Sequence, residues 1–206
     1  MSNYVITISR KYGSGGRLIG QKLATKLGIP FYDKTIIEMA AKNTGISEGY
    51  IERSGETIAN SFLFNMAYAG QANYRYIAQS DTPINDKVYY AQEAIVKQIA
   101  DKGGCVIVGR CAEYILRNNP NAVRIYVTAA MPDRVERAIN EYGVEPEGVE
   151  KEIKRVDKGR ANYFKFYTHE QWGDMELYDL CINTSHTGLD GAVEIIEALL
   201  NARYKK

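Results

Sequence analysis

An apolar run leads directly into a glycine-rich turn in Tyr4-Val-Ile-Thr-Ile-Ser-Arg-Lys-Tyr-Gly-Ser-Gly-Gly-Arg-Leu18. Residues 4–9 have the pattern of a buried strand, and a helical pattern follows the glycines. Glycine permits positive φ and close approach of the backbone, and a helix N-terminus offers unpaired N–H groups with a partial positive charge. The stretch therefore predicts a phosphate-binding turn, flanked by the positive charges of Arg10, Lys11 and Arg17. A strand-to-helix turn that needs glycine only for its geometry is the alternative interpretation.

Short apolar segments alternate with longer helical patterns along the rest of the chain. Strands that alternate with helices form a parallel sheet with right-handed crossovers. The pattern predicts an α/β fold with three layers around a five-stranded parallel sheet. The predicted strands are residues 4–9, a short strand within residues 28–33, and residues 105–108, 123–128 and 180–182.

The charges of the chain are almost balanced. Its 206 residues contain 26 Lys and Arg against 25 Asp and Glu, which gives a formal net charge of +1. Proteins that coat nucleic acid or bind anionic membranes rely on an excess of positive charge. We therefore expect neither nucleic acid nor a membrane as a partner, and we expect any important positive charge to be local.

The N-terminal residues lack the basic segment and the long apolar run of a secretion signal, so we expect a cytoplasmic location. Cys105, Cys111 and Cys181 are then expected to be free thiols of a reducing compartment. Because His169 and His186 have no ligand-like spacing to these cysteines, we expect no metal site built from protein ligands.

Two longer segments interrupt the alternation within a predicted single domain of residues 1–206. The first insertion, residues 34–102, is mostly helical, and the second insertion, residues 131–178, contains a basic helix from Val149 to about Lys165. Such insertions commonly follow the carboxyl ends of strands, where α/β enzymes bind ligands. Extra core helices or the contact surface of a homodimer are the alternatives.

The segment Gly13-Ser-Gly-Gly16 is similar to the centre of a Walker A loop, and the chain resembles the cytidylate kinase-like family of P-loop nucleoside monophosphate kinases. The loop is degenerate, because Arg10 stands at its first glycine, Gly16 stands at its lysine and no Ser or Thr follows. In P-loop proteins the lysine reaches the β- and γ-phosphates and the hydroxyl holds Mg²⁺. We expect Arg17 or Lys11 to replace the charge of the lysine.

The resemblance implies a P-loop fold with strand order 2-3-1-4-5, in which the first insertion binds the acceptor and the second forms a lid. It extends to Val106-Ile-Val-Gly-Arg110, which is similar to the family strand whose final Arg grips the monophosphate. A guanidinium can bind phosphate through two parallel N–H donors. Cys111 stands where the family pattern continues with Asp, so the identity of the acceptor, CMP or another compound, stays open. A structural ion pair of Arg110 with Glu113 is the alternative.

Two further motifs of the resemblance lie in the second insertion. Arg134 and Arg137 follow the fourth strand, where the family has the arginines that begin its lid, and their spacing puts them on one helix face. Asp157-x-x-Arg160 is similar to the lid motif whose Asp meets the acceptor ribose and whose Arg meets phosphate. For Arg134 and Arg137, a solvated helix face shared with neighbouring acids is the alternative.

Asp33 follows the second strand, where the family has its first acceptor-site Asp. It is predicted either to orient the acceptor or to cap a helix that begins at Thr35. Asn183-Thr-Ser185, at the end of the fifth strand, corresponds to a family loop near the base of the donor.

Tyrosine is unusually frequent, with 16 residues that gather largely in the two insertions. Tyr163, Phe166 and Tyr167 share a helix face, which favours packing. The aromatic residues of the first insertion are interpreted either as a stacking surface for a base or as a helical core or dimer face, and the second interpretation is preferred. This group, in which Arg75 accompanies the aromatic residues as a cation, comprises Tyr50, Phe62, Phe64, Tyr68, Tyr74, Arg75, Tyr76, Tyr89 and Tyr90.

These observations predict a phosphotransferase that moves the γ-phosphoryl of ATP to a small phosphorylated acceptor, which the resemblance implies to be a nucleoside monophosphate. ATP and Mg²⁺ are expected to bind together as Mg-ATP, with no dedicated protein ligand for the metal. A non-catalytic module that binds nucleotide or phosphate and a kinase that acts on a non-nucleotide small molecule are the alternatives.

The predicted site has three overlapping groups of residues. The catalytic group is Arg17, Arg110, Asp157 and Arg160. The donor-binding group is Arg10, Lys11, Gly13, Ser14, Gly15, Gly16, Arg17, Arg134 and Arg137. The acceptor-binding group is Asp33, Arg110, Cys111, Asp157 and Arg160.

Overall fold

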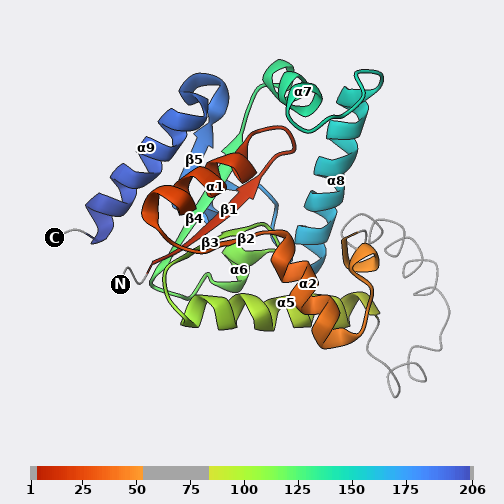
Figure 1. The fold of residues 1–206 in the computed structure, drawn as a ribbon, viewed down its shortest axis with the longest axis vertical. Helices are drawn as coiled ribbons and strands as arrows, with labels where there is room; N and C mark the ends of the chain where they lie inside the picture. Colours follow the sequence, from red (N-terminus) through yellow and green to blue (C-terminus); the bar gives the residue numbers. More distant parts are fainter. Residues whose placement is uncertain (1–3, 53–83, 205–206) are drawn as a thin grey trace.

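The computed structural model describes residues 4–52 and 84–204 of the chain. Their strands form a five-stranded sheet with the order β2-β3-β1-β4-β5, and every strand pair is parallel. This arrangement confirms the predicted fold class and strand order (Figure 1). The strands are β1 (Val5–Arg10), β2 (Phe31–Tyr32), β3 (Cys105–Val108), β4 (Ala122–Thr128) and β5 (Leu180–Asn183).

Helices cover both faces of the sheet and complete the three layers (Figure 1). One face packs against α1 (Gly16–Leu27) and α9 (Thr184–Tyr204). The other face packs against α2 (Lys34–Thr44), α5 (Ile84–Asp101) and α6 (Ala112–Ile115). After β4, the chain forms α7 (Met131–Asn140) and α8 (Val149–Thr168), which lie toward the carboxyl ends of the strands.

The central strand is buried on both faces, which explains its lack of polar alternation. Val5 belongs to the core under α2 and α5, whereas Ile6 and Ile8 belong to the core under α1 and α9. The carboxyl end of β1 is therefore fixed by packing from both sides, and the turn that follows it starts from a rigid position.

The second strand is short and lies within residues 28–33, as predicted, because the residues before it complete the end of α1. Gly28 adopts a φ of +64°, and its N–H donates to the carbonyl of Thr25 at 3.3 Å. The N–H of Ile29 donates to the carbonyl of Ala24 at 3.1 Å. Gly28 thus caps the first helix, as its position predicts.

Helices occupy the described parts of both insertions. The first insertion contains α2 and α5, and the second contains α7, α8 and a short 3₁₀ helix at Met175–Leu177. The basic helix α8 continues past Lys165 to Thr168 and ends where His169 adopts a φ of 61°. Among the described helices, none has the length and apolar content that crossing a membrane requires. Part of the first aromatic group lies outside the described residues, namely Phe62, Phe64, Tyr68, Tyr74, Arg75 and Tyr76.

Replacement of a central core residue tests the assigned packing. Ile125 of β4 has none of its surface exposed. We expect Ile125→Ala to lower the free energy of unfolding by about 2–5 kcal/mol, because lost apolar burial and an unfilled cavity both cost stability. Urea denaturation measures this change. Ile195→Ala on α9 is the matched control, because Ile195 is 39% exposed, and an equal loss in both variants would contradict the assignment.

Candidate functional site

The glycine loop, residues 11–15, joins β1 to α1 at the carboxyl edge of the sheet. Gly13 and Gly15 have φ values of +76° and +82°, which other residues rarely adopt. A Cβ on Gly13 would lie 2.5 Å from the carbonyl oxygen of Arg134, so α7 approaches too closely for any side chain there. These two positions therefore require glycine both for their conformation and, at Gly13, for space.

Backbone donors at the start of α1 are available to a ligand. Among the described residues, the N–H groups of Gly15, Gly16 and Arg17 have no protein acceptor. Ser14 is fully buried and stabilises the turn internally, since its N–H and its hydroxyl both donate to the carbonyl of Lys11. The loop thus has the unpaired donors and the helix N-terminus that bind phosphate.

Side chains of α7 and α8 bind the backbone of the glycine loop. Arg134 Nε donates to the carbonyl of Tyr12 at 2.7 Å, and Arg137 Nη1 donates to that of Gly13 at 2.6 Å. Asp157 Oδ1 accepts the N–H of Tyr12 at 2.8 Å, and Oδ2 forms an ion pair with Arg134. The alternative interpretation, in which Arg134 belongs to a solvated helix face, is therefore wrong, because Arg134 is only 4% exposed. Both oxygens of Asp157 are bound to this assembly.

The start of α9 also contacts the loop. Thr184 Oγ1 donates to the carbonyl of Ser14 at 2.9 Å, and a Cβ on Gly15 would collide with Leu189. The segment Asn183-Thr-Ser185 therefore lies beside the loop. Its expected position near the base of a donor stays a prediction.

Three guanidiniums, those of Arg10, Arg110 and Arg160, line the same cleft. Arg160 Nη1 donates to the carbonyl of Arg10 at 2.9 Å. Burial, together with the nearby charge of Arg10, lowers the pKa of Arg160 to about 9. Burial also lowers the pKa of Arg10, and the carboxylate of Asp33 opposes that shift. Gathered positive charges that have lost water favour the binding of an anion.

Arg110 and Cys111 adopt a left-handed backbone, with φ values of 59° and 54°. A non-glycine residue in such a conformation costs about 1–3 kcal/mol, and this kind of strain clusters at functional sites. In the part of the chain that the structure describes, no ion pair or hydrogen bond joins Arg110 to Glu113, so the alternative role of Arg110 as a structural partner of Glu113 is wrong. Cys111 is buried, and burial raises the pKa of its thiol.

Asp33 is an ion-pair partner for two arginines of the site. Its Oδ2 accepts from Arg17 Nε at 2.8 Å, and its Oδ1 lies 3.9 Å from Arg10 Nη2. Asp33 occupies the N-cap position of α2, but its side chain makes no capping hydrogen bond. The interpretation of Asp33 as a helix cap is therefore wrong, and its carboxylate orients charge at the cleft instead.

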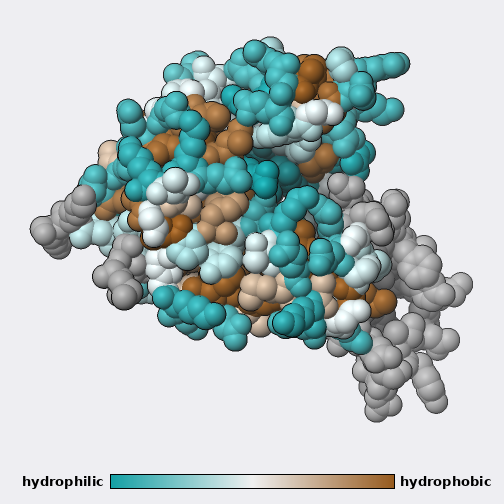
Figure 2. Space-filling model, viewed as in Figure 1, coloured by the Kyte–Doolittle hydropathy of each residue, from teal (hydrophilic) through white to brown (hydrophobic). Residues whose placement is uncertain are grey.

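The cleft has a volume of about 690 Å³. In Figure 2, hydrophilic side chains gather in the recess between the α7–α8 region and the part of the molecule below it. Ser14, Gly15, Arg134, Arg137 and Asp157 do not line the cleft and instead form or hold the loop. The predicted site residues that line it are Arg10, Lys11, Gly13, Gly16, Arg17, Asp33, Arg110, Cys111 and Arg160.

Glu113 is a further residue of the cleft that sequence reasoning considered only as a partner for Arg110. It is 3% exposed, and its Oε2 has no hydrogen-bond partner in the described part of the chain. The hydroxyl of Tyr178 donates to Oε1 at 3.5 Å. Burial raises the pKa of this carboxyl group. In the sequence, the one indication that Glu113 has a role was its position three residues after Arg110.

The residues present fit the phosphates of Mg-ATP better than they fit a bare metal ion. Within residues 4–52 and 84–204, no cluster of His, Cys, Asp and Glu could hold a metal. Of the two nearby hydroxyls, Ser9 Oγ accepts from Trp172 Nε1 at 2.9 Å, and Ser14 Oγ donates to the carbonyl of Lys11. That a Mg²⁺ brought by ATP takes its ligands from phosphate and water stays a prediction.

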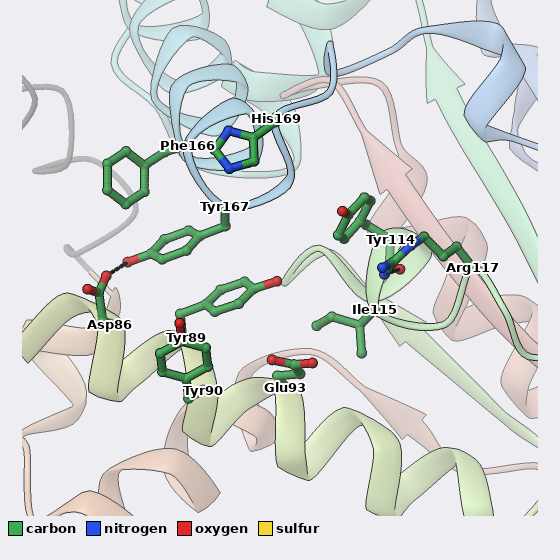
Figure 3. A pocket seen from close by; sticks show the side chains of 10 residues that line it. All are labelled: Asp86, Tyr89, Tyr90, Glu93, Tyr114, Ile115, Arg117, Phe166, Tyr167 and His169. Atoms are coloured by element: carbon green, nitrogen blue, oxygen red, sulfur yellow. Dashed lines mark hydrogen bonds between the residues drawn. The ribbon is translucent and has the colours of Figure 1, made fainter. Parts of the chain in front are cut away.

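Aromatic rings of the two insertions pack against each other (Figure 3). The rings of Tyr89 and Tyr167 stack with their centroids 4.0 Å apart and their planes 1° apart. The hydroxyl of Tyr167 donates to Asp86 at 3.2 Å. Tyr163 contacts the same group and also lines the main cleft. These contacts agree with the packing interpretation and make the aromatic group part of the wall of the cleft.

The strand order and the glycine loop between β1 and α1 define a P-loop α/β fold. Shikimate kinase from Acinetobacter baumannii superposes with a TM-score of 0.54 at 12% identity, covering 98% of this chain and 96% of the kinase. At this identity the similarity shows the fold alone. A protein from Eubacterium ventriosum that is described as uncharacterized superposes with a TM-score of 0.71 at 26% identity, covering 97% and 99% of the two chains.

The chain belongs to the cytidylate kinase-like family, whose model matches residues 5–186. Cytidylate kinase from Ignicoccus hospitalis is 25% identical over 198 residues, which cover 95% of this chain and 98% of the relative. Cytidylate kinase from Pyrococcus horikoshii is 26% identical over 199 residues, which cover 96% of this chain and 88% of the relative. Membership of this family supports phosphotransferase activity in general.

The ion pair between Asp157 and Arg134 is expected to be important for stability. Asp157→Ala leaves the buried guanidinium of Arg134 and the N–H of Tyr12 without a carboxylate. We expect the free energy of unfolding to fall by about 3 kcal/mol, because an unpaired buried charge is costly. Glu136→Ala on the exposed side of α7 is the control for removing an acid. Urea denaturation curves that coincide for Asp157→Ala and the wild type would refute this role.

Proposed function

We propose that the protein transfers the γ-phosphoryl group of ATP to the phosphate of a small acceptor, and that this acceptor is a nucleoside monophosphate. The observation that carries the proposal is the pairing of two anion-binding features in one cleft. The glycine loop and the N-terminus of α1 offer backbone donors, and Arg110 and Arg160 offer guanidiniums beside them. The relatives named cytidylate kinase support the class of acceptor.

The proposed reaction is a displacement at the γ-phosphorus. An oxygen of the acceptor phosphate forms a bond to the γ-phosphorus while the bond from that phosphorus to the β–γ bridging oxygen breaks, and ADP leaves. The protein contributes position and positive charge rather than covalent chemistry. Arg110 and Arg160 hold the acceptor phosphate, and Arg17 adds charge near the donor.

The role of Asp157 differs from that of a ligand-binding carboxylate in the structure as it stands. Both of its oxygens are bound by Tyr12 and Arg134. We assign it to holding the glycine loop, while its contact with acceptor hydroxyls stays a prediction. Arg134 and Arg137 support the donor site through the same loop.

A second candidate function is a phosphate-binding module without turnover. Gly16 and Arg17 stand where P-loop enzymes have a lysine and a hydroxyl, which is the observation that favours it. A kinase for a non-nucleotide acceptor is favoured by Cys111, which stands where the family has an Asp. The three candidates differ in their products.

One assay separates these candidates. Purified protein is incubated with Mg-ATP and a panel of nucleoside monophosphates, sugar phosphates and small alcohols, and ADP is measured. Formation of ADP that depends on a nucleoside monophosphate supports the proposal. Formation of ADP only with a non-nucleotide favours the third candidate. No ADP with any acceptor, together with a rise in Tm on adding ATP, favours the binding module and contradicts both kinase functions.

Arg110→Ala tests the assignment of the acceptor site. We expect kcat/KM for the productive acceptor to fall about 100-fold, because charge-assisted hydrogen bonds to a phosphate are lost, while the KM for ATP changes much less. Arg117→Ala is the control, because Arg117 stacks on Tyr114 at 4.0 Å and does not line the cleft. An equal loss of kcat/KM in both variants, or a larger effect on ATP, would contradict the assignment.

A further inference from the structure

The side chain of Arg10 occupies the space beside Gly16. A Cβ on Gly16 would lie 2.6 Å from Cβ and 3.1 Å from Cγ of Arg10. Gly16 is the first residue of α1 and its φ is not positive, so its backbone tolerates an L side chain. Its other near neighbour, Cβ of Val127, would be 3.3 Å away, which a small shift relieves. The stem of Arg10 is therefore what requires glycine at position 16.

The guanidinium of Arg10 reaches across the cleft to the end of β3. A Cβ on Gly109 would collide with Arg10 Nη1, and Nη2 lies 3.9 Å from Oδ1 of Asp33. Gly109 immediately precedes Arg110, which we assign to the acceptor phosphate. Arg10 thus extends from the donor loop to the acceptor side, along the path that connects the two anion sites.

The residue types at the two ends of the Walker A loop are exchanged in this chain. The motif begins with glycine, and its seventh residue is a lysine that reaches the β- and γ-phosphates. Here the same positions hold Arg10 and Gly16. Because the stem of Arg10 fills the space where a side chain of residue 16 would begin, a long cationic side chain enters that space from the strand instead of from the helix.

We propose that Arg10 supplies the charge of the missing lysine, binding the β- and γ-phosphates of ATP and the phosphoryl group in transfer. The proposal rests on the proposed function, because it places the transferred group between the glycine loop and Arg110. Negative charge on the equatorial oxygens of that group is stabilised by a preorganised cation. The side chain of Arg10 is 20% exposed, and the contact of its stem with Gly16 together with its ion pair with Asp33 holds the guanidinium in place before a ligand binds.

The other two cations near the loop are less suited to this role. The side chain of Arg17 is 47% exposed, and its Nε is bound by Asp33 at 2.8 Å. Lys11 lines the cleft, but no contact fixes its ammonium group in the described part of the chain. The stem of Arg10, in contrast, provides the two nearest atoms to a Cβ placed on residue 16.

The steric part of the proposal is tested by a double-mutant cycle on stability. Gly16→Ala in the wild-type background is expected to lower Tm by about 5 °C, because the new Cβ overlaps the stem of Arg10. In the Arg10→Gly background the same change is expected to leave Tm unchanged or raise it, because alanine favours a helix over glycine. Equal shifts of Tm in the two backgrounds would overturn the assigned contact.

The functional part of the proposal is tested by moving the positive charge from residue 10 of β1 to residue 16 of α1. Arg10→Gly is expected to weaken Mg-ATP binding about tenfold and to lower kcat about 100-fold. The double variant Arg10→Gly with Gly16→Lys is expected to have a kcat about tenfold or more above that of Arg10→Gly alone. Arg17→Ala is expected to lower kcat less than Arg10→Gly does. Calorimetry measures the affinity for ATP, and Tm confirms that each variant is folded.

The outcomes distinguish this proposal from the proposed function. If the wild type forms no ADP with any acceptor, the proposed function fails. The role of Arg10 is then decided by one measurement, which is whether the double variant recovers the affinity for ATP that Arg10→Gly loses. If the wild type is active and the folded double variant recovers neither ATP affinity nor kcat, the role of Arg10 is refuted and the proposed function stands. Recovery of ATP affinity and kcat in the double variant supports the proposal that Arg10 replaces the lysine of residue 16. A lysine at residue 16 could not restore a contact that Arg10 makes on the acceptor side.

Discussion

The ion pair between Asp157 and Arg134 connects the three segments that form the donor side of the cleft. Each partner also binds the backbone of Tyr12, so one carboxylate and one guanidinium hold the glycine loop against both α7 and α8. A loop whose N–H groups bind a phosphate cannot also use them in hydrogen bonds within the loop. Contacts from other parts of the chain must therefore hold its conformation. The position of Arg160, one turn further along α8, depends on the same contact.

The balanced net charge of the chain conceals a cluster of three guanidiniums in the cleft. The charges of Arg10 and Arg110 lie close enough to lower the pKa of Arg160, while the carboxylates of Asp33, Glu113 and Asp157 partly offset the positive charge of the cluster. Guanidiniums held this close repel one another in the free protein. We expect a bound phosphate to relieve this repulsion, which would favour polyphosphates over neutral ligands.

Local patterns were sufficient to predict most of the fold. The buried strands have continuous apolar runs, and β2 is short because Gly28 and Ile29 complete the end of α1. In the site, the sequence placed Arg10, Arg17, Arg110 and Arg160 at the cleft, since glycine and arginine motifs follow strand ends. Arg134 and Arg137, which were also predicted to bind the donor, hold the glycine loop instead. The sequence could not predict the partners of Asp157 and Asp33, because these depend on the tertiary approach of other segments. Gly16 was interpreted as a lost lysine, and only the structure shows that Arg10 excludes a side chain there.

The stack of Tyr89 on Tyr167 has a mechanical consequence. α8 carries Asp157 and Arg160 near its middle and Tyr167 near its end, and its 20 residues span about 30 Å as a stiff rod. One end of this rod is anchored to α5 of the first insertion, and its middle is anchored to the glycine loop. We expect a tilt of α5 to move α8 with it while the rings remain stacked, so that the residues of α8 that line the cleft follow the first insertion.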